Sequence, residues 1–444
     1  MRWYRQGNHS VIQVNEEEKI FALLDELRKK EYKPSPVKRI YIPKKNGSKR
    51  ALGIPVIRDR IVQQSIVNVL SPKFEEGIFH KCSCGYRPNM GIERVMQIIL
   101  WYIDHDYTHI YDCDIKGFFD NIPHKNLMKI LTKYIADGTV LDMIWQWLKS
   151  GYMEEGKYMD TLSGSPQGGV ISPLLSNVYL NELDWALEEA GIKFVRYCDD
   201  FLLFAKTEEE IKRAGKIAKQ VIENLGLEIA MSKTKFVDFN KDDFDFVGFS
   251  FKHWRNKKNS NHKFYMVEPT KESFNDFKYK IKKATRKTLT LGQDAWVKRV
   301  NPIIRGKINY YVIPYKAVQK NKAYGLESRC YLKGFSRELH KIDAYTRQRL
   351  RVCMIHVHPT VRKGMSMMHK WNIERFCKIK LIPANWLYYD IMWGYPIEKY
   401  IEKQTTKNKK RQAKYVERLK TEGVEYYTKD RIDKIAYSKG LVTT

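Results

Sequence analysis

Apolar side chains recur every three to four residues in several parts of the chain, which is the period of an amphipathic α-helix. In the segment 16–31 this apolar stripe consists of Ile20, Leu23, Leu24 and Leu27. Pro34 and Pro36 follow the segment and would end the helix. The same periodicity, or a proline at a helix start, predicts further helices at 59–70, 91–103, from about 123, 174–187 and 207–225.

Short runs rich in β-branched and aromatic residues predict strands between these helices. The strands are expected at 37–43, 108–115, 235–240 and 245–251, with a hairpin at 194–204. A basic turn at 44–47 would connect the first strand to a second one. Because strands and helices alternate, this part of the chain is expected to form an α+β unit. It contains no glycine-rich phosphate loop, so dinucleotide-binding and P-loop functions lack their sequence signature.

The pattern changes after about residue 262, where strand signals fade. Basic amphipathic helices are expected there at 270–289, 293–314 and 322–354. The remainder of the chain is rich in Lys, Arg, Trp and Tyr and includes a basic run at 403–414. The sequence therefore predicts a helical, positively charged region behind the α+β unit.

Composition and charge narrow the class of partner. The chain has 444 residues, of which 43% are hydrophobic, so several packed cores are expected. Lys and Arg number 80 against 51 Asp and Glu, which gives a formal net charge of +29. Such an excess favours a polyanionic partner, above all nucleic acid. A basic surface that binds nothing is the alternative.

The sequence also bears on location. No apolar run approaches the roughly 20 residues that cross a bilayer, and the first residues lack a signal-peptide pattern. The seven cysteines are an odd number without metal-type spacing, and we expect reduced thiols. Cys82 and Cys84 are expected to be structural. We therefore expect a cytoplasmic protein with no membrane partner.

Two acidic segments carry the candidate chemistry. Asp199 and Asp200 lie between two apolar strands, where adjacent carboxylates repel each other unless a cation is present. Taken alone, this pair is more typical of a plain turn. On the strand 108–115, however, a period of two places Asp112 and Asp114 on one face. Carboxylates at strand ends suit Mg²⁺, and two such ions about 3.5–4 Å apart can activate a hydroxyl and stabilise a pyrophosphate leaving group.

Five ordered segments, followed by two more in the helical region, resemble one protein family. Residues 197–200 (YCDD) resemble the YxDD box of reverse transcriptases, and 114–122 resemble their first catalytic block. Residues 163–177 resemble the PQG block of the group II intron branch. Residues 52–64 are similar to the fingers motif of that branch, and 246–249 to the block beside the primer grip. Residues 302–311 and 344–354 resemble the thumb, or domain X, of group II intron proteins.

The resemblance implies an α+β right-hand polymerase whose palm is an antiparallel sheet packed on helices. It implies fingers at 37–105, a palm with interleaved fingers segments at 106–262 and a helical thumb at 263–354. A short N-terminal segment, 1–36, would precede them, and a basic C-terminal region, 355–444, would follow. The N-terminal extension typical of intron-encoded relatives looks shortened. No HNH-type nuclease is apparent, because nothing completes a site around His356 and His358.

The resemblance also assigns roles to residues. The catalytic residues would be Asp114, Asp199 and Asp200, which with the carbonyl of Ile115 would hold two Mg²⁺ ions, or Mn²⁺ instead. The expected nucleotide-binding residues are Lys49, Arg50, Phe119 and Gln167, with Phe119 as a steric gate against a ribose 2′-hydroxyl. The expected primer- or template-binding residues are Gly248, Arg305, Tyr310 and Arg347. A solvated surface charge is the alternative for each basic residue, and core packing is the alternative for Phe119.

The implied activity is RNA-directed DNA polymerisation. The partners would be an RNA template, a cognate structured RNA, a DNA or RNA primer and deoxynucleoside triphosphates. The biological role is open between group II intron splicing with retrohoming and antiviral defence by copying a non-coding RNA. A non-catalytic RNA-binding maturase is one alternative function. An RNA-dependent RNA polymerase is another, which Phe119 disfavours.

Overall fold

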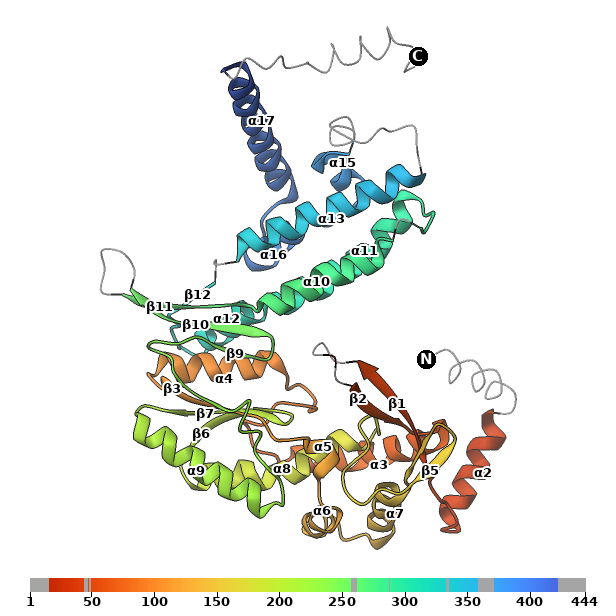
Figure 1. The fold of residues 1–444 in the computed structure, drawn as a ribbon. Helices are drawn as coiled ribbons and strands as arrows, with labels where there is room; N and C mark the ends of the chain where they lie inside the picture. Colours follow the sequence, from red (N-terminus) through yellow and green to blue (C-terminus); the bar gives the residue numbers. More distant parts are fainter. Residues whose placement is uncertain are drawn as a thin grey trace. The chain divides into compact units, whose positions relative to one another are not determined.

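The computed structural model describes residues 16–43, 47, 49–256, 262–286, 288–332, 335–357 and 371–421. The chain divides into two units (Figure 1). The first unit takes in the chain up to Val247 together with Phe251–Tyr265 and Lys316–Cys330. The second unit takes in Gly248–Ser250, Met266–Tyr315 and the chain from Tyr331 onwards.

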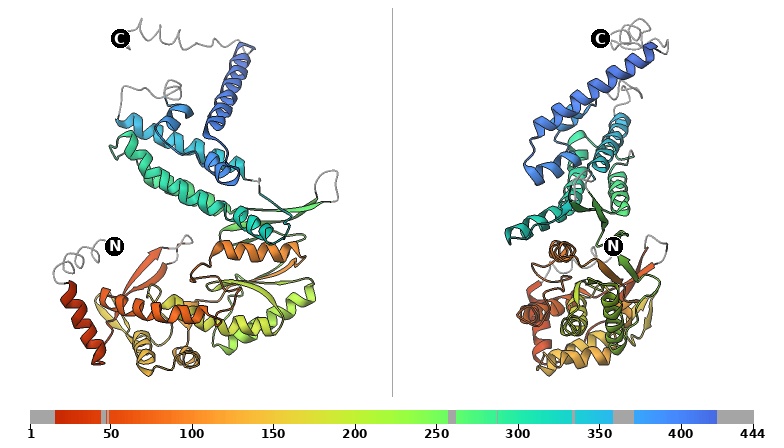
Figure 2. Two further views of the ribbon diagram at one scale, coloured as in Figure 1. Left: turned by 180° about the vertical axis from the view of Figure 1, so that it is seen from behind. Right: turned by 90° about the vertical axis from the view of Figure 1, so that its left-hand side faces the viewer.

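The first unit is built around an antiparallel sheet in the order β6-β7-β3-β8. Its strands are β3 (His109–Cys113), β6 (Lys193–Tyr197), β7 (Asp200–Ala205) and β8 (Lys235–Asp238). The helix α4 (Ile92–Asp104) covers one face, and α8 (Ser172–Glu189) and α9 (Glu208–Asn224) cover the other (Figures 1 and 2). Since both faces are covered, the side chains of β7 from Phe201 to Ala205 are all buried.

A second sheet of the first unit has the order β2-β1-β4-β5. Its strands are β1 (Val37–Pro43), β2 (Lys49–Ile54), β4 (Tyr152–Glu154) and β5 (Lys157–Met159). The hairpin β1–β2 is antiparallel, whereas β4 joins β1 in parallel, so distant segments of the chain share this sheet. The other helices of this unit are α2 (Glu16–Arg28), α3 (Ile57–Glu75), α5 (Phe118–Asn121), α6 (His124–Leu131), α7 (Gly138–Lys149) and α12 (Ile313–Ala323), the last of which begins in the second unit.

A third sheet has the order β12-β11-β10-β9, and the division between the units passes through it. Its strands are β9 (Phe244–Phe246), β10 (Phe249–Asn256), β11 (Lys263–Pro269) and β12 (Cys330–Tyr331). Within the first unit, Arg329 donates to the Asp104 carbonyl, 2.6 Å away, and Asn321 donates to the Gln97 carbonyl at 3.1 Å. These bonds attach the segment 316–330 to α4.

The second unit is helical. Its helices are α10 (Lys271–Ala284), α11 (Gln293–Tyr311), α13 (Ser336–Val357), α15 (Ile373–Lys378), α16 (Ala384–Trp393) and α17 (Ile397–Thr421). On α10, Phe274, Phe277 and Ile281 recur at helical spacing and face the core. They pack in one cluster with the fully buried Trp296 of α11. Figure 2 shows α17 extending away from the other helices of this unit.

Most predicted elements of the α+β part are confirmed, with shifts of a few residues at their ends. The predicted single strand 245–251 is wrong, because the positive φ angles of Val247 (+41°) and Gly248 (+77°) form a turn that separates β9 from β10. The predicted helix 322–354 is wrong, because α12 ends at Ala323 and α13 begins at Ser336. Gly325, with a φ of +77°, follows α12 in a backbone conformation that a helix cannot adopt. The expectation that strands end near 262 is also wrong, because β11 and β12 follow. The helix α7 was not predicted.

Several predictions fall outside the described residues. They concern residues 44–46 of the basic turn, residues 1–15 of the N-terminal segment, and residues 358–370, which include His358, and 422–444 of the C-terminal region. The domain boundaries at 36, 105, 262 and 354 stay predictions. Within the described ranges, no helix combines the length and apolar character needed to cross a membrane.

Candidate active site

The predicted acidic hairpin is confirmed. Tyr197 of β6 pairs with Asp200 of β7, so only Cys198 and Asp199 form the turn. Cys198 has a φ of +63°, a conformation that two-residue hairpins require at this position and that residues other than glycine rarely adopt. The turn therefore places Asp199 at the tip of the hairpin and Asp200 at the first position of β7.

Asp114 lies directly beyond the end of β3, next to this hairpin. The register pairs Cys113 with Phe201, so the next step along both strands brings Asp114 opposite Asp200. Burial, followed by the negative charges of Asp199, Asp114 and Asp112, raises the pKa of Asp200 to about 6. Burial also raises the pKa of Asp199, and Asp114 adds to that shift. The three predicted carboxylates therefore meet at one end of the sheet and repel one another.

Two cations lie near these carboxylates. The Lys233 Nζ is 2.5 Å from Asp114 Oδ2, and the charges of Arg50 and Lys233 partly oppose the raised pKa of Asp199. The amide of Ala230 donates to the Asp114 carbonyl at 2.8 Å, which fixes the segment around Lys233 beside the end of β3. Sequence reasoning missed Lys233, because 119 positions separate it from Asp114 and no local pattern announces the contact.

The donor set suits a hard divalent cation. All three side chains offer carboxylate oxygens, and their mutual repulsion leaves negative charge that a cation would neutralise. In the part of the chain that the structure describes, no three His, Cys, Asp or Glu side chains converge closely enough to hold a metal by themselves. An ion here would therefore need further oxygens, such as a backbone carbonyl or substrate phosphates.

A buried arginine, Arg196, supports the hairpin. Arg196 precedes the turn by one residue, and its side chain is fully buried with that of Asp184 from α8. Its Nε lies 2.7 Å from Asp184 Oδ1, and its Nη2 donates to Asp184 Oδ2 and to Ser83 Oγ. Its Nη1 donates to the Cys198 carbonyl at 2.9 Å and to Asn177 Oδ1 at 3.1 Å. Arg196 therefore fixes the peptide group between Cys198 and Asp199, inside the acidic turn.

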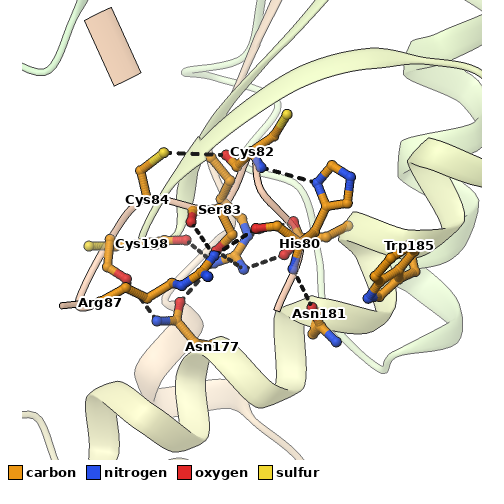
Figure 3. A network of polar contacts seen from close by, with 12 residues as sticks. His80, Cys82, Ser83, Cys84, Arg87, Asn177, Asn181, Trp185 and Cys198 are labelled. Atoms are coloured by element: carbon orange, nitrogen blue, oxygen red, sulfur yellow. Dashed lines mark hydrogen bonds and ion pairs between the residues drawn. The ribbon is translucent and has the colours of Figure 1, made fainter. Parts of the chain in front are cut away.

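The segment 82–85 packs directly against the turn (Figure 3). The Cys84 amide donates to the Arg196 carbonyl at 2.9 Å, and Asn177 Nδ2 donates to the Gly85 carbonyl at 2.7 Å. A Cβ on Gly85 would lie 2.3 Å from the Cys198 nitrogen, so only glycine fits there. Arg87 holds the next part of the loop through the carbonyl of Ser83.

The first part of the predicted PQG block, residues 163–171, belongs to the loop that connects β5 to α8, and this loop is hydrogen-bonded to β2 and α5. The Gly53 amide of β2 donates to the Gln167 carbonyl at 2.8 Å. Gln63 of α3 accepts from the Val170 amide at 2.8 Å. At the other end, the Ser165 amide donates to the Phe119 carbonyl at 2.8 Å. These hydrogen bonds therefore fix the position of Gln167 relative to Phe119.

Phe119 and Gln167 line one cavity of about 320 Å³. Arg39 also lines it, and its guanidinium lies 3.7 Å from the centre of the Tyr152 ring. Lys49 lies on the face of β2 that Ala51 and Gly53 present to the cavity, whereas Arg50 lies on the opposite face. The structure thus brings together Phe119 and Gln167, and it adds Arg39, which sequence reasoning missed.

The predicted primer- or template-binding residues belong to the second unit. Gly248 has a φ of +77°, and a Cβ there would lie 3.0 Å from Tyr310 Oη. Tyr310 also stacks on Phe249, with ring centres 5.0 Å apart. Arg305 is exposed on α11.

Arg347 of α13 is half-buried near Asp343. Burial raises the pKa of Asp343 to about 6, and the charge of Arg347 opposes this shift. Asp343 is thus a buried partner that competes with any nucleic acid for Arg347. Gly248 and Tyr310 are brought together, and all four nucleic-acid roles stay predictions.

Comparisons with known proteins agree with this geometry. A model of the reverse transcriptase (RNA-dependent DNA polymerase) family matches residues 42–251. Protein YkfC of Escherichia coli strain K12 is 32% identical over 280 residues, which are 54% of this chain and 73% of that protein. Group II intron-encoded protein LtrA of Lactococcus lactis subsp. cremoris is 35% identical over 215 residues, which are 46% of this chain. That match spans 34% of LtrA, about a third of its length.

Solved telomerase structures resemble the chain only distantly. Telomerase from Candida albicans with a fragment of telomeric RNA gives a TM-score of 0.43 at 14% identity, over 80% of this chain and 67% of that one. Telomerase from Candida tropicalis with the same type of fragment gives 0.40 at 14% identity, over 80% and 64%.

Asp184→Asn tests the support behind the hairpin. The change leaves the buried Arg196 without its counter-charge, which typically costs about 3–5 kcal/mol. We expect the first unit to lose about this much free energy of unfolding, as measured by urea denaturation followed by circular dichroism. Glu182→Gln is the matched control on the same helix, because Glu182 forms an exposed pair with Lys133. Its loss should stay below about 1 kcal/mol, and equal losses in both variants would contradict the assignment.

Asp112→Asn tests the repulsion between the carboxylates. Burial, opposed by Lys235 and reinforced by Asp114 and Asp245, raises the pKa of Asp112 to about 6. The stability that its proton provides is present below about pH 4 and is lost as the pH rises through about 6. Without divalent metal, the uncharged variant should melt roughly 2–4 °C above the wild type at pH 7.5. The difference should vanish near pH 4.

Asp238→Asn is the control with the opposite sign. Burial alone would raise the pKa of Asp238, but hydrogen bonds from Lys241 and Asn240 outweigh it and lower this pKa. Its contribution is therefore present above about pH 4 and is lost as the pH falls. The variant should melt below the wild type at pH 7.5. A shift of the same sign in both variants would refute the repulsion argument.

Proposed function

The chain belongs to the reverse transcriptase (RNA-dependent DNA polymerase) family, and from this premise we propose that it extends a primer on an RNA template with deoxynucleoside triphosphates. The predicted fold class, an α+β right-hand polymerase, is confirmed with the family. The observation that carries the proposal is the meeting of Asp114, Asp199 and Asp200 at one end of the β6-β7-β3-β8 sheet.

Reverse transcriptases generally use divalent metal ions, and the carboxylates of this site suit them. Asp114, Asp199, Asp200 and the carbonyl of Ile115 would hold two Mg²⁺ ions, or Mn²⁺ instead. Bound there, the ions would activate the primer hydroxyl and neutralise charge on the pyrophosphate leaving group. Lys233 occupies Asp114 Oδ2 and has to release this oxygen when a cation binds. Arg196 keeps the turn in place while the charges around it change.

The cavity behind the PQG loop supports a nucleotide site. Phe119 would exclude a ribose 2′-hydroxyl, and Gln167 would contact the nucleotide from the same cavity. Lys49 on the cavity face of β2 would bind the triphosphate as a fixed cation, and we assign the same role to Arg50, although it lies on the opposite face. Support for Arg50 comes from its electrostatic effect on Asp199. In this assignment β1 and β2 belong to the fingers at 37–105, and the catalytic sheet belongs to the palm at 106–262.

The second unit would contact the primer and template. We assign this role to Gly248, Arg305, Tyr310 and Arg347, within a thumb at 263–354. The net charge of +29 supports a nucleic-acid partner, because 80 Lys and Arg residues exceed the 51 Asp and Glu residues that could neutralise them. Shape and backbone, rather than base edges, are what a protein reads on an A-form hybrid.

For the biological role we propose the processing of a group II intron RNA, since LtrA is named as a group II intron-encoded protein. Antiviral defence by copying a non-coding RNA is the other role. Sequencing the RNA that copurifies with the protein distinguishes them: intron sequence supports the first role, and a short structured RNA without splice sites supports the second. All seven cysteines are unpaired, which supports a cytoplasmic location.

Asp199→Ala tests the polymerase activity. The change removes a ligand from the proposed metal site, and several kcal/mol of transition-state stabilisation should go with it. We expect deoxynucleotide incorporation on an RNA template with Mg²⁺ to fall by on the order of 10³-fold or more. Asp242→Ala removes an exposed carboxylate of the same unit and should leave incorporation unchanged. Normal incorporation by Asp199→Ala would refute the proposal.

Phe119→Ala tests the choice between DNA and RNA synthesis. Removing the ring opens the cavity where a 2′-hydroxyl would lie, and a pocket contact of this kind contributes roughly 10–200-fold to discrimination. We expect the preference for deoxynucleotides over ribonucleotides in primer extension to fall by this order. Phe236→Ala truncates an exposed aromatic ring on β8, away from the cavity, and should keep the preference. An unchanged preference in Phe119→Ala would contradict the assignment of Phe119 as the steric gate.

A further inference from the structure

The helix α17 carries a stripe of lysines along one face. Its members are Lys399, Lys403, Lys407, Lys410 and Lys414, and all five are exposed. At 100° per residue they fall within an arc of about 80°, and they span about 22 Å of helix. Of the acidic residues of α17, Glu398 and Glu402 lie outside this arc, and Glu417 lies within it, three positions beyond Lys414 at the far end. We call these five residues the lysine stripe.

The start of α17 is held in place by a buried contact. The Tyr400 hydroxyl donates to Asp343 Oδ2 of α13 at 3.2 Å, and both side chains are buried. Asp343 also accepts from the amides of Ala384 and Asn385 at the start of α16, at 2.6 and 3.1 Å. One carboxylate therefore joins α13, α16 and α17, and the lysine stripe keeps its direction within the second unit.

Cations from α13 and α17 converge around His340, and only Arg347 among them has an acidic partner described above, Asp343. Burial lowers the pKa of His340 on α13, and the charges of Lys407, Arg347 and Lys403 lower it further. Each lysine of the stripe lacks an ion pair with any residue in the described ranges. Like charges placed together in this way repel, and a polyanion relieves the repulsion.

We propose that the lysine stripe and the adjoining part of α13 bind the sugar–phosphate backbone of double-stranded RNA. Lysines along 22 Å of helix can contact several phosphates in succession, and such contacts hold a nucleic acid without reading its bases. The arc of α17 that the stripe occupies holds no aromatic residue on which unpaired bases could stack, so this face favours a duplex over single strands.

The choice of RNA rests on the proposed function, since an enzyme that copies a structured RNA meets its duplex segments. The surface is distinct from the catalytic carboxylates, which belong to the first unit. It therefore gives the enzyme a way to hold its cognate RNA that does not use the polymerase site.

The test is a triple substitution in the full-length protein, Lys403→Gln with Lys407→Gln and Lys410→Gln. The probe is a labelled RNA duplex of about 20 base pairs, and the readout is fluorescence anisotropy over a range of salt concentrations. Each phosphate contact contributes about 0.9 to the slope of log affinity against log salt, so the slope should fall by about 3. At roughly physiological salt we expect binding to weaken by about 10–100-fold.

The matched control removes three lysines from the first unit, by Lys125→Gln, Lys129→Gln and Lys216→Gln. These residues are also exposed and, among the residues that the structure describes, also form no ion pair. The control should bind the duplex like the wild type. Equal weakening in both triple variants, or unchanged binding by the stripe variant, would overturn the proposal.

Two further arms separate the remaining explanations. A Lys→Arg version of the stripe variant keeps the charge and should bind RNA like the wild type; weak binding by it would show a structural defect and overturn the proposal. A DNA duplex of the same sequence identifies the partner, and weakening confined to DNA would also overturn it. Asp199→Ala should bind the RNA duplex normally, so this test and the test of polymerase activity can fail independently.

Discussion

The buried ion pair between Arg196 and Asp184 is the interaction on which the active site depends. Neither side chain is exposed, so both charges lose their hydration, which is costly unless every polar atom finds a partner. A guanidinium has five N–H groups, and five hydrogen bonds satisfy them here. One of these bonds fixes the Cys198 carbonyl inside the acidic turn. The main role of this ion pair is therefore to position the acidic turn, rather than to add to the free energy of folding.

The acidic turn needs this support because it combines repelling carboxylates with an unfavourable backbone conformation. Asp199 and Asp200 repel each other and Asp114, and Cys198 adopts a conformation that is strained for a residue with a side chain. A hairpin with only its own strand bonds could relax by bending. The contacts of the Gly85 segment and of Arg196 leave the turn no room to do so. The strained backbone and the repulsion between the carboxylates therefore persist in the folded state. A divalent cation bound there would neutralise the repulsion.

Much of this site could be predicted from the sequence, because local rules govern it. Alternation predicted a strand that reaches Asp114, which in the structure follows directly after the last residue of β3, and apolar flanks predicted the hairpin around Asp199 and Asp200. The supporting residues escaped prediction for the opposite reason. Arg196 looks like an isolated polar residue in an apolar strand, and Asp184 looks like a surface residue of a helix. Only the packing of α8 behind the sheet turns them into a buried pair.

Contacts between residues far apart in the chain also explain why the helix predicted at 322–354 was wrong. They further decide which charged residues are neutralised in the fold. Residues 326–332 could not continue α12, because Arg329 bonds to Asp104 more than 220 positions away. The sequence counts every Lys and Arg alike toward +29, whereas the structure separates them by their partners. Arg196 and Arg87 are neutralised by Asp184 and Glu75 and position the chain.

The lysine stripe of α17 lacks such counter-charges within the described chain. A charge that the fold neutralises no longer attracts a distant polyanion, and a charge left open toward solvent does. Charges that build the site are therefore separate from the charges that we propose to bind RNA. This separation allows an enzyme with a large positive excess to keep a tightly ordered, negatively charged catalytic centre.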